Sequence, residues 1–426
     1  MIKAGFGQRV ITPEIGAEMP GSISKRFSQN VHDDLLVNAM VIDDGNTQLA
    51  LVGLDALSIK RSTTLNARGQ IADATGIPAN NVLIAASHTH NGGPIADVFM
   101  SESDVAYCDF VAAQLAQAAI EGYEKRETAT LVIGAGHEGS VAFNRRFRMK
   151  DGSERTHPGV GNPDIVQVAG PIDPMVGVIG AINQSCRFLG CWVNYCCHAT
   201  LGVGGGGFSA DYIYYLRKTV QQAMKADHAI IVFGNGASGD VTQVDNLRDR
   251  GKQSGECWGW HVGTTVGAEA VKVLARMDYT NEITLACTTD TLELPLRDLD
   301  DMSLNQAQSW GDQAVWGREL ELLKEIKGIE PKVTAEVQMM RIGSAGLIAV
   351  PAEYFCQYGL DIQECSPFDP TFVVSLANGC VGYVPTPQAF VGGGYEPRTA
   401  RSSKLCPDAG DRIAATAIRL LHRAHG

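Results

Sequence analysis

The feature that most constrains the fold of this chain is a set of short, mostly apolar runs, each followed by small residues and a polar side chain. Five such runs lie at residues 82–86, 188–197, 229–233, 346–351 and 371–378. Apolar runs of this length are typical of strands that are covered on both faces. We therefore expect an α/β fold with mixed, largely parallel β-sheets flanked by helices, and an active site at the carboxyl ends of the strands.

The polar side chains after these runs belong to types that bind metals or move protons. In chain order they are His88, His90, His198, Asp240, Glu353 and Tyr383. Ligands of open α/β sheets bind in the crevice outside the carboxyl ends of the strands, so we expect these side chains to converge. Two histidines and a carboxylate form a common zinc ligand set that leaves a position open for water. The pattern therefore predicts a shared metal site, although it contains no local signature such as His-Glu-x-x-His.

Each of these residues also has a purely structural interpretation. His88 and His90 could belong to a capped turn. His198 stands alone after an apolar strand, where a histidine is more often a satisfied core residue. A glutamate in the position of Glu353 often lies at the positive end of a helix, and Tyr383 could simply pack. The residues taken one by one leave both interpretations open.

Asp240 and three further residues carry weaker signals. Arg145 lies among alternating basic and aromatic residues, which could clamp an anionic group or a developing oxyanion, or form a solvated loop. Asp211 and Asp240 both follow small residues, as caps of helices and turns do. His32 precedes an apolar run and is interpreted as a turn histidine, with a pocket wall as the alternative.

The sequence also predicts the local structure of three segments. Residues 37–55 are predicted to form a hairpin around the turn Asp44-Gly45. The stretch 144–174 is rich in glycine, proline and charge, which predicts a long loop. Residues 408–425 have the spacing of a closing amphipathic helix.

The net charge, the hydropathy and the cysteine spacing exclude several classes of protein. The 426 residues carry a formal net charge of −12, which argues against nucleic acid and against stable binding to an anionic membrane. No apolar stretch is long enough to span a bilayer, and the first residues lack the apolar core of a signal peptide. The eleven cysteines show no framework spacing and suit a reducing compartment. We therefore expect a cytoplasmic protein with a small-molecule substrate, while its oligomeric state is not indicated.

Seven short motifs together resemble the catalytic domain of the neutral (non-lysosomal) ceramidase family and follow the order of that family. They occupy residues 86–94, 144–146, 194–200, 209–212, 236–241, 350–353 and 382–387. The resemblance implies a zinc-dependent amidase and a single catalytic domain over residues 1–426. The family's typical members carry a further C-terminal immunoglobulin-like domain, which we do not expect here because the sequence ends close to its predicted closing helix.

The resemblance also implies roles for individual residues. It implies Zn²⁺ ligation by His88, His198, Glu353 and Tyr383. His90 matches the second histidine of the family motif, which is thought to act as acid and base. Arg145 matches an arginine near the scissile carbonyl, and Tyr395 lies at the spacing of a second active-site tyrosine.

The predicted function is hydrolysis of an amide, ester or lactone bond by metal-activated water. Residues 147–174 are polar for the rim of a lipid pocket, so we expect a polar substrate rather than ceramide. The alternative is a zinc-dependent lyase or isomerase acting on a sugar acid or polyol, with His90 as a base on carbon. A non-catalytic binding protein is a third hypothesis, which the complete set of matching residues disfavours.

Overall fold

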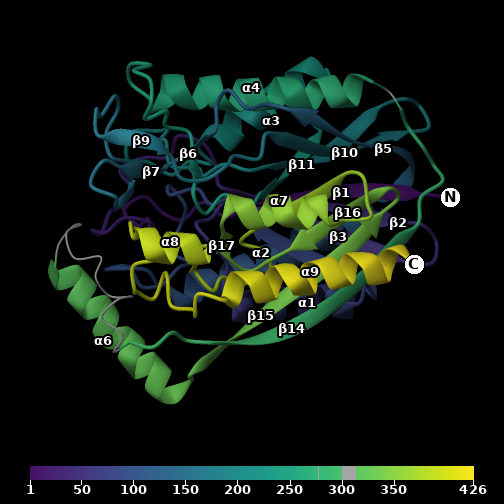
Figure 1. Cartoon of the computed structure of the whole chain (residues 1–426). Coiled ribbons are helices and arrows are strands. Elements are labelled where there is room, and N and C mark those ends of the chain that lie inside the picture. The colour runs from purple at the N-terminus through teal and green to yellow at the C-terminus, as the bar shows by residue number, and fades with distance from the viewer. Residues whose placement is uncertain (277, 300–312) are drawn as a thin grey trace.

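The structure is a computed structural model that describes residues 1–276, 278–299 and 313–426. Two β-sheets pack face to face, and helices cover the outer face of each (Figure 1). The predicted mixed α/β architecture with helix-flanked sheets is confirmed. Within the described part of the chain, no helix is both long enough and apolar enough to cross a membrane.

The larger sheet has eight strands. In spatial order they are β12 (Ile230–Asn235), β11 (Phe188–Tyr195), β10 (Met175–Asn183), β5 (Glu127–His137), β1 (Lys3–Val10), β2 (Leu36–Asp43), β3 (Gln48–Leu54) and β4 (Val82–Ala86). Only the pairs β11–β12 and β3–β4 are parallel. The expectation of largely parallel sheets is therefore wrong in this detail. Strands joined by short connections, such as the predicted hairpin β2–β3, must run antiparallel, because a parallel pair needs a long crossover.

The large sheet curls until its two edges approach each other. Strand β12 at one edge contacts β2, β3 and β4 near the other edge. The side chain of Asn38 on β2 donates a hydrogen bond to the Ile231 carbonyl on β12 at 3.1 Å. Gly53 on β3 has no side chain at the point where a Cβ atom would lie 2.5 Å from the Phe233 carbonyl. The curl brings the carboxyl ends of β4 and β11 close together.

The smaller sheet has four strands. In spatial order they are β14 (Leu285–Pro295), β15 (Lys332–Ile342), β16 (Ala345–Ala349) and β18 (Thr371–Val374). Side chains alternate between two cores, as the two-residue period of a strand requires. On β2, Val41 faces the helices while Met40 and Ile42 enter the core between the sheets, where Leu347 and Phe372 meet them.

The helices form the outer layers (Figure 1). Those packed on the larger sheet are α1 (Arg61–Thr75), α2 (Val105–Glu124), α3 (Tyr212–Ala223) and α4 (Glu256–Ala275). Those packed on the smaller sheet are α7 (Cys356–Glu364) and α9 (Ala409–His425), the latter being the predicted closing helix. The remaining described helices are η1 (Ala79–Asn81), α6 (Gln313–Ile329) and α8 (Pro387–Gly392).

The predicted long loop at 144–174 is instead largely built around a small antiparallel sheet. Its strands are β7 (Arg146–Met149), β8 (Glu154–Thr156) and β9 (Ile165–Val168). The prediction failed because these strands are short and buried ion pairs support them: Arg146 pairs with Glu154 at 2.6 Å and with Glu396 at 2.7 Å. Two further strand pairs are β6 (Phe143–Asn144) with β13 (Val241–Thr242), and β17 (Glu353–Tyr354) with β19 (Tyr383–Val384).

Candidate metal centre and catalytic site

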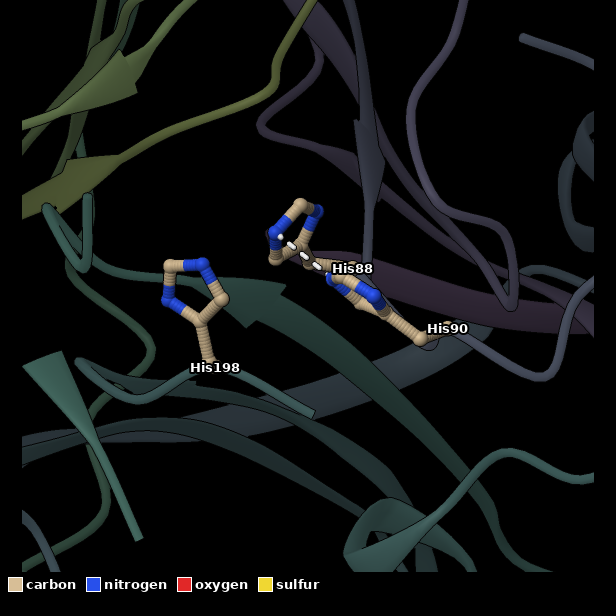
Figure 2. Close-up of side chains that lie close together, drawn as sticks. All are labelled: His88, His90 and His198. Atoms are coloured by element: carbon tan, nitrogen blue, oxygen red, sulfur yellow. Dashed lines mark hydrogen bonds between the residues drawn. The ribbon is translucent and has the colours of Figure 1, made fainter. Parts of the chain in front are cut away.

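Three imidazole rings meet where the chain leaves β4 and β11 (Figure 2). A bridge between Thr89 and Ala199 pairs the two exit segments, so that His88 and His90 from one face His198 from the other. The rings of His88 and His198 have centroids 4.4 Å apart. One nitrogen of each of the three histidines lies within 4.8 Å of the other two. The sheet topology thus brings together the histidines singled out in the sequence.

The hydrogen bonds of these rings fix which nitrogen carries the proton. Each Nδ1 atom lies 2.7–2.8 Å from a backbone carbonyl oxygen, and the carbonyls belong to Leu57, Gly21 and Ser238. A carbonyl only accepts, so each Nδ1 is the donor, and a neutral ring then has a lone pair on Nε2. The Nε2 atoms of His88 and His90 are only 3.4 Å apart (Figure 2). Two lone pairs at this distance repel each other unless a cation or a proton lies near them.

A carboxylate oxygen completes this electron-rich centre. Oε2 of Glu353 lies 3.2 Å from Nε2 of His88 and 3.5 Å from Nε2 of His198. This oxygen is buried and has no hydrogen-bond partner among the residues that the structure describes. A buried charge without a partner is costly. The donor set of imidazole nitrogens and one carboxylate therefore fits a bound divalent metal ion.

Tyr383 and Arg145 border the same centre. The register of β17 and β19 places Tyr383 beside Glu353, and its hydroxyl lies 3.5 Å from Nε2 of His198. Nη2 of Arg145 donates to that hydroxyl at 3.0 Å, and Nη1 lies 3.2 Å from Nε2 of His198. The ring of Tyr395 meets the ring of Tyr383 edge-on, with centroids 5.7 Å apart. All seven residues implied by the resemblance therefore lie in one contiguous group, and their chemical roles stay predictions.

Burial and the local charges set the protonation of the group. Burial, together with Arg145 and His88, lowers the pKa of His198 to about 3. Burial also lowers the pKa of His90 well below its usual value. Burial alone would raise the pKa of Glu353, but positive charge in the imidazole group, on His88 first, outweighs burial and lowers that pKa well below its ordinary range. At neutral pH, His90 and His198 are neutral, which is the form of imidazole that metal binding requires.

The weaker sequence candidates lie around this group. Asp240 accepts hydrogen bonds from Asn144 at 2.7 Å and from the amide of Cys356 at 2.8 Å, so it supports the segment that carries Arg145. Asp211 caps helix α3, which confirms its structural interpretation. The ring nitrogens of His32 lie 2.6 Å from a carboxylate oxygen of Asp33 and 2.9 Å from one of Glu256, and His32 lies outside the imidazole group.

Glu396 is the residue at this site that the sequence reasoning missed. It is fully buried and binds Arg145 at 2.8 Å, Arg146 at 2.7 Å and the hydroxyl of Thr156 at 2.8 Å. It fixes the Arg145 guanidinium against the centre. One sequence signal pointed towards it: Glu396 directly follows Tyr395, which the resemblance implies at the site.

Comparisons with known proteins agree with this fold. The crystal structure of neutral ceramidase from Pseudomonas aeruginosa superimposes with a TM-score of 0.77 at 17% sequence identity, over 99% of this chain and 75% of that one. A ceramidase complexed with C2 gives a TM-score of 0.75 with the same identity and coverage. No family model matches the chain, and no curated protein matches its sequence.

The chain therefore shares the α/β fold of these two solved structures. The resemblance to neutral ceramidase drawn from the sequence motifs is confirmed at the level of the fold, over almost the whole chain.

Proposed function

We propose that this protein is a zinc-dependent hydrolase that cleaves an amide, ester or lactone bond in a polar small molecule. The observation that carries the proposal is the convergence of three imidazole Nε2 lone pairs with the unpartnered Glu353 oxygen. The neutral-ceramidase fold supports it, because the same fold is found in an enzyme named for cleaving an amide lipid.

The ligand set that we propose is His88, His198, Glu353 and Tyr383. His88 and His198 are almost completely buried, with 2% and 1% of their surface exposed, and their Nδ1 protons are held by backbone carbonyls. Such orientation of a ligand histidine by its second nitrogen is common in metal sites. These four residues would hold a zinc ion, which would supply a water molecule of lowered pKa and would polarise a carbonyl group.

His90 is the proposed acid and base. It is half-buried, whereas the other two histidines are buried, and its Nε2 lone pair faces the centre. Neutral His90 can accept a proton from the attacking water and give it to the leaving nitrogen or oxygen. Such proton transfer typically contributes about 10²–10⁴-fold to the rate.

Arg145 and Tyr395 are the proposed oxyanion groups. Burial opposes the charge of Arg145, but Tyr383 and Glu396 outweigh it and raise the pKa of Arg145, so the guanidinium stays charged. A fixed, buried cation beside a reacting carbonyl stabilises the negative charge that develops on the oxygen.

Metal analysis tests the site. We expect about one zinc ion per chain in the wild type and its loss in His198→Ala. The matched control is His32→Ala, which removes a histidine outside the imidazole group and should keep the metal. A wild-type protein that binds no metal after incubation with zinc would refute the proposed mechanism.

Product analysis tests the reaction class. Hydrolysis in H₂¹⁸O must place solvent oxygen in the acid product, whereas a lyase or isomerase acting on a sugar acid or polyol need not. His90→Ala should lower kcat by about 10²–10⁴-fold while the metal content stays unchanged. Unchanged activity in this variant would exclude the acid–base role.

A further inference from the structure

A cavity of about 250 Å³ opens beside the candidate metal centre. The residues that line it include His88 and Glu353 of that centre and three basic residues, Lys60, Arg401 and Lys404. Ligand sites usually have volumes of about 300–1,000 Å³, so this cavity suits a small ligand or one end of a larger one.

Two of the three cations in this wall are already neutralised. Lys60 pairs with Asp97 at 2.5 Å. Arg401 pairs with Glu319 at 2.8 Å and with Glu102 at 3.1 Å. Neither group therefore presents a surplus positive charge to the cavity.

Lys404 differs from its neighbours. Its ammonium group donates to the Arg401 carbonyl oxygen at 2.8 Å, and it forms no ion pair with any carboxylate in the described ranges 1–276, 278–299 and 313–426. An ammonium group has three donors, and one carbonyl uses only one of them. Burial, together with the nearby Arg401, lowers the pKa of Lys404, and the opposing effect of Glu319 does not restore it. The cavity wall thus holds a half-buried cation with unused hydrogen-bond donors.

The remaining wall is largely apolar. Its aliphatic members are Leu57, Ile59, Ala96, Val98 and Ile326. A cavity whose lining holds apolar side chains, a cation and residues of a candidate metal centre suits a short hydrocarbon segment that joins an anionic group to the bond to be cleaved. The ammonium group of Lys404 carries a single charge and both neighbouring cations are already engaged, so this position suits a singly charged carboxylate better than a phosphate.

We propose that this cavity binds a carboxylate of the substrate through Lys404, which makes small carboxylate-bearing amides or esters, such as N-acyl amino acids, the preferred substrate class. The identity of the cleaved bond rests on the proposed hydrolase function, whereas carboxylate binding does not. Lys404 is a specificity-determining residue in this scheme.

Calorimetric titration with matched probes tests the proposal. The probes are N-acetylglycine, N-acetyl-β-alanine and N-acetyl-γ-aminobutyrate, each compared with its neutral carboxamide. In the full-length wild type, at least one carboxylate should bind about 10–100-fold more tightly than its carboxamide, as expected for a charge-assisted hydrogen bond.

Substitution of the lysine should remove this preference. Lys404→Gln keeps a donor for the Arg401 carbonyl and should bind carboxylate and carboxamide equally, while Lys404→Arg should retain part of the preference. Lys272→Met, which removes a lysine paired with Glu269 on the outer helix α4, is the matched control and should behave as the wild type. Equal binding of both probes by the wild type overturns the proposal even if Lys404→Gln does not fold.

A carboxylate preference that survives in folded Lys404→Gln also overturns the proposal, because the carboxylate would then bind elsewhere, for example at the metal. Activity separates this proposal from the function on which it builds. If the zinc-loaded enzyme hydrolyses carboxylates and carboxamides with equal kcat/KM, the proposed hydrolase function is supported and the proposed carboxylate site is refuted. If the carboxylate preference depends on Lys404 but no probe is hydrolysed, the carboxylate site is supported and the proposed hydrolase function loses support.

Discussion

Glu396→Gln removes a carboxylate that two adjacent buried arginines share. Burial alone would raise the pKa of Glu396, but Arg145 and Arg146 outweigh it and lower that pKa from 4.5 to about 2. The difference corresponds to about 3 kcal/mol of stability at neutral pH, at about 1.4 kcal/mol for each tenfold change in the proton equilibrium. Breaking a buried ion pair by removal of one partner typically costs about 3–5 kcal/mol. We therefore expect Glu396→Gln to lower the free energy of unfolding by about 3 kcal/mol.

The pH dependence has a definite sign. Because the folded-state pKa is lowered, the contribution of Glu396 is fully present above the unfolded-state pKa of 4.5 and is lost as the pH falls towards 2. Between pH 7 and pH 3.5, the difference between wild type and Glu396→Gln should shrink by about 1.4 kcal/mol. Protonation of other groups is common to both proteins and cancels in this difference.

Urea denaturation at several pH values measures both quantities. The control is Glu127→Gln, which removes a carboxylate from an exposed pair with Arg187 and should cost at most about 1 kcal/mol. A loss for Glu396→Gln no larger than that of the control would refute the argument. A difference that stays constant down to pH 3.5 would show that the two arginines do not lower this pKa.

Two further predictions concern stability. Arg217 forms a two-armed ion pair with the fully buried Asp55 at 2.6 and 2.8 Å, so Arg217→Met should cost about 3–5 kcal/mol in urea denaturation; a loss below about 1 kcal/mol would contradict this expectation. Gly69 lies inside helix α1 with open space at its Cβ position, whereas a Cβ atom on Gly5 would lie 2.1 Å from a carbonyl oxygen of helix α2. Gly69→Ala should therefore raise the free energy of unfolding by about 0.5–1 kcal/mol, and Gly5→Ala should lower it by about 1–3 kcal/mol. In thermal unfolding, Gly69→Ala should have the higher Tm of the two, and the reverse order would exclude this explanation.

The fold class could be predicted from the sequence, but the pairing of the strands could not. The apolar runs identified strands such as β4 and β11 because burial on both faces leaves a strong local signal. The order of the strands depends on contacts between distant segments, and the curl that brings β12 towards β4 leaves no local pattern. The sheet β7–β9 was missed because its stability comes from charged groups, which in the sequence are typical of an exposed loop.

Some residues of the candidate site could likewise be predicted from the sequence, and others could not. The positions of His88, His198 and Glu353 follow from strand ends, so their convergence could be expected from the sequence. Glu396 could not be placed in this way, because its partner Arg145 is 251 residues away along the chain. The free charge of Lys404 also required the structure, since only three-dimensional contacts show that its lysine and arginine neighbours are neutralised.

The hydrogen-bond acceptors that orient the three imidazoles are main-chain atoms, supplied at positions 57, 21 and 238. Any amino acid at these positions carries the same carbonyl oxygen, so a point mutation there leaves the acceptor in place as long as the backbone keeps its path. The orientation of the imidazole rings therefore does not depend on which side chains stand at these three positions. The lining of the cavity can change over generations, and with it the molecules that bind, while the imidazole geometry persists.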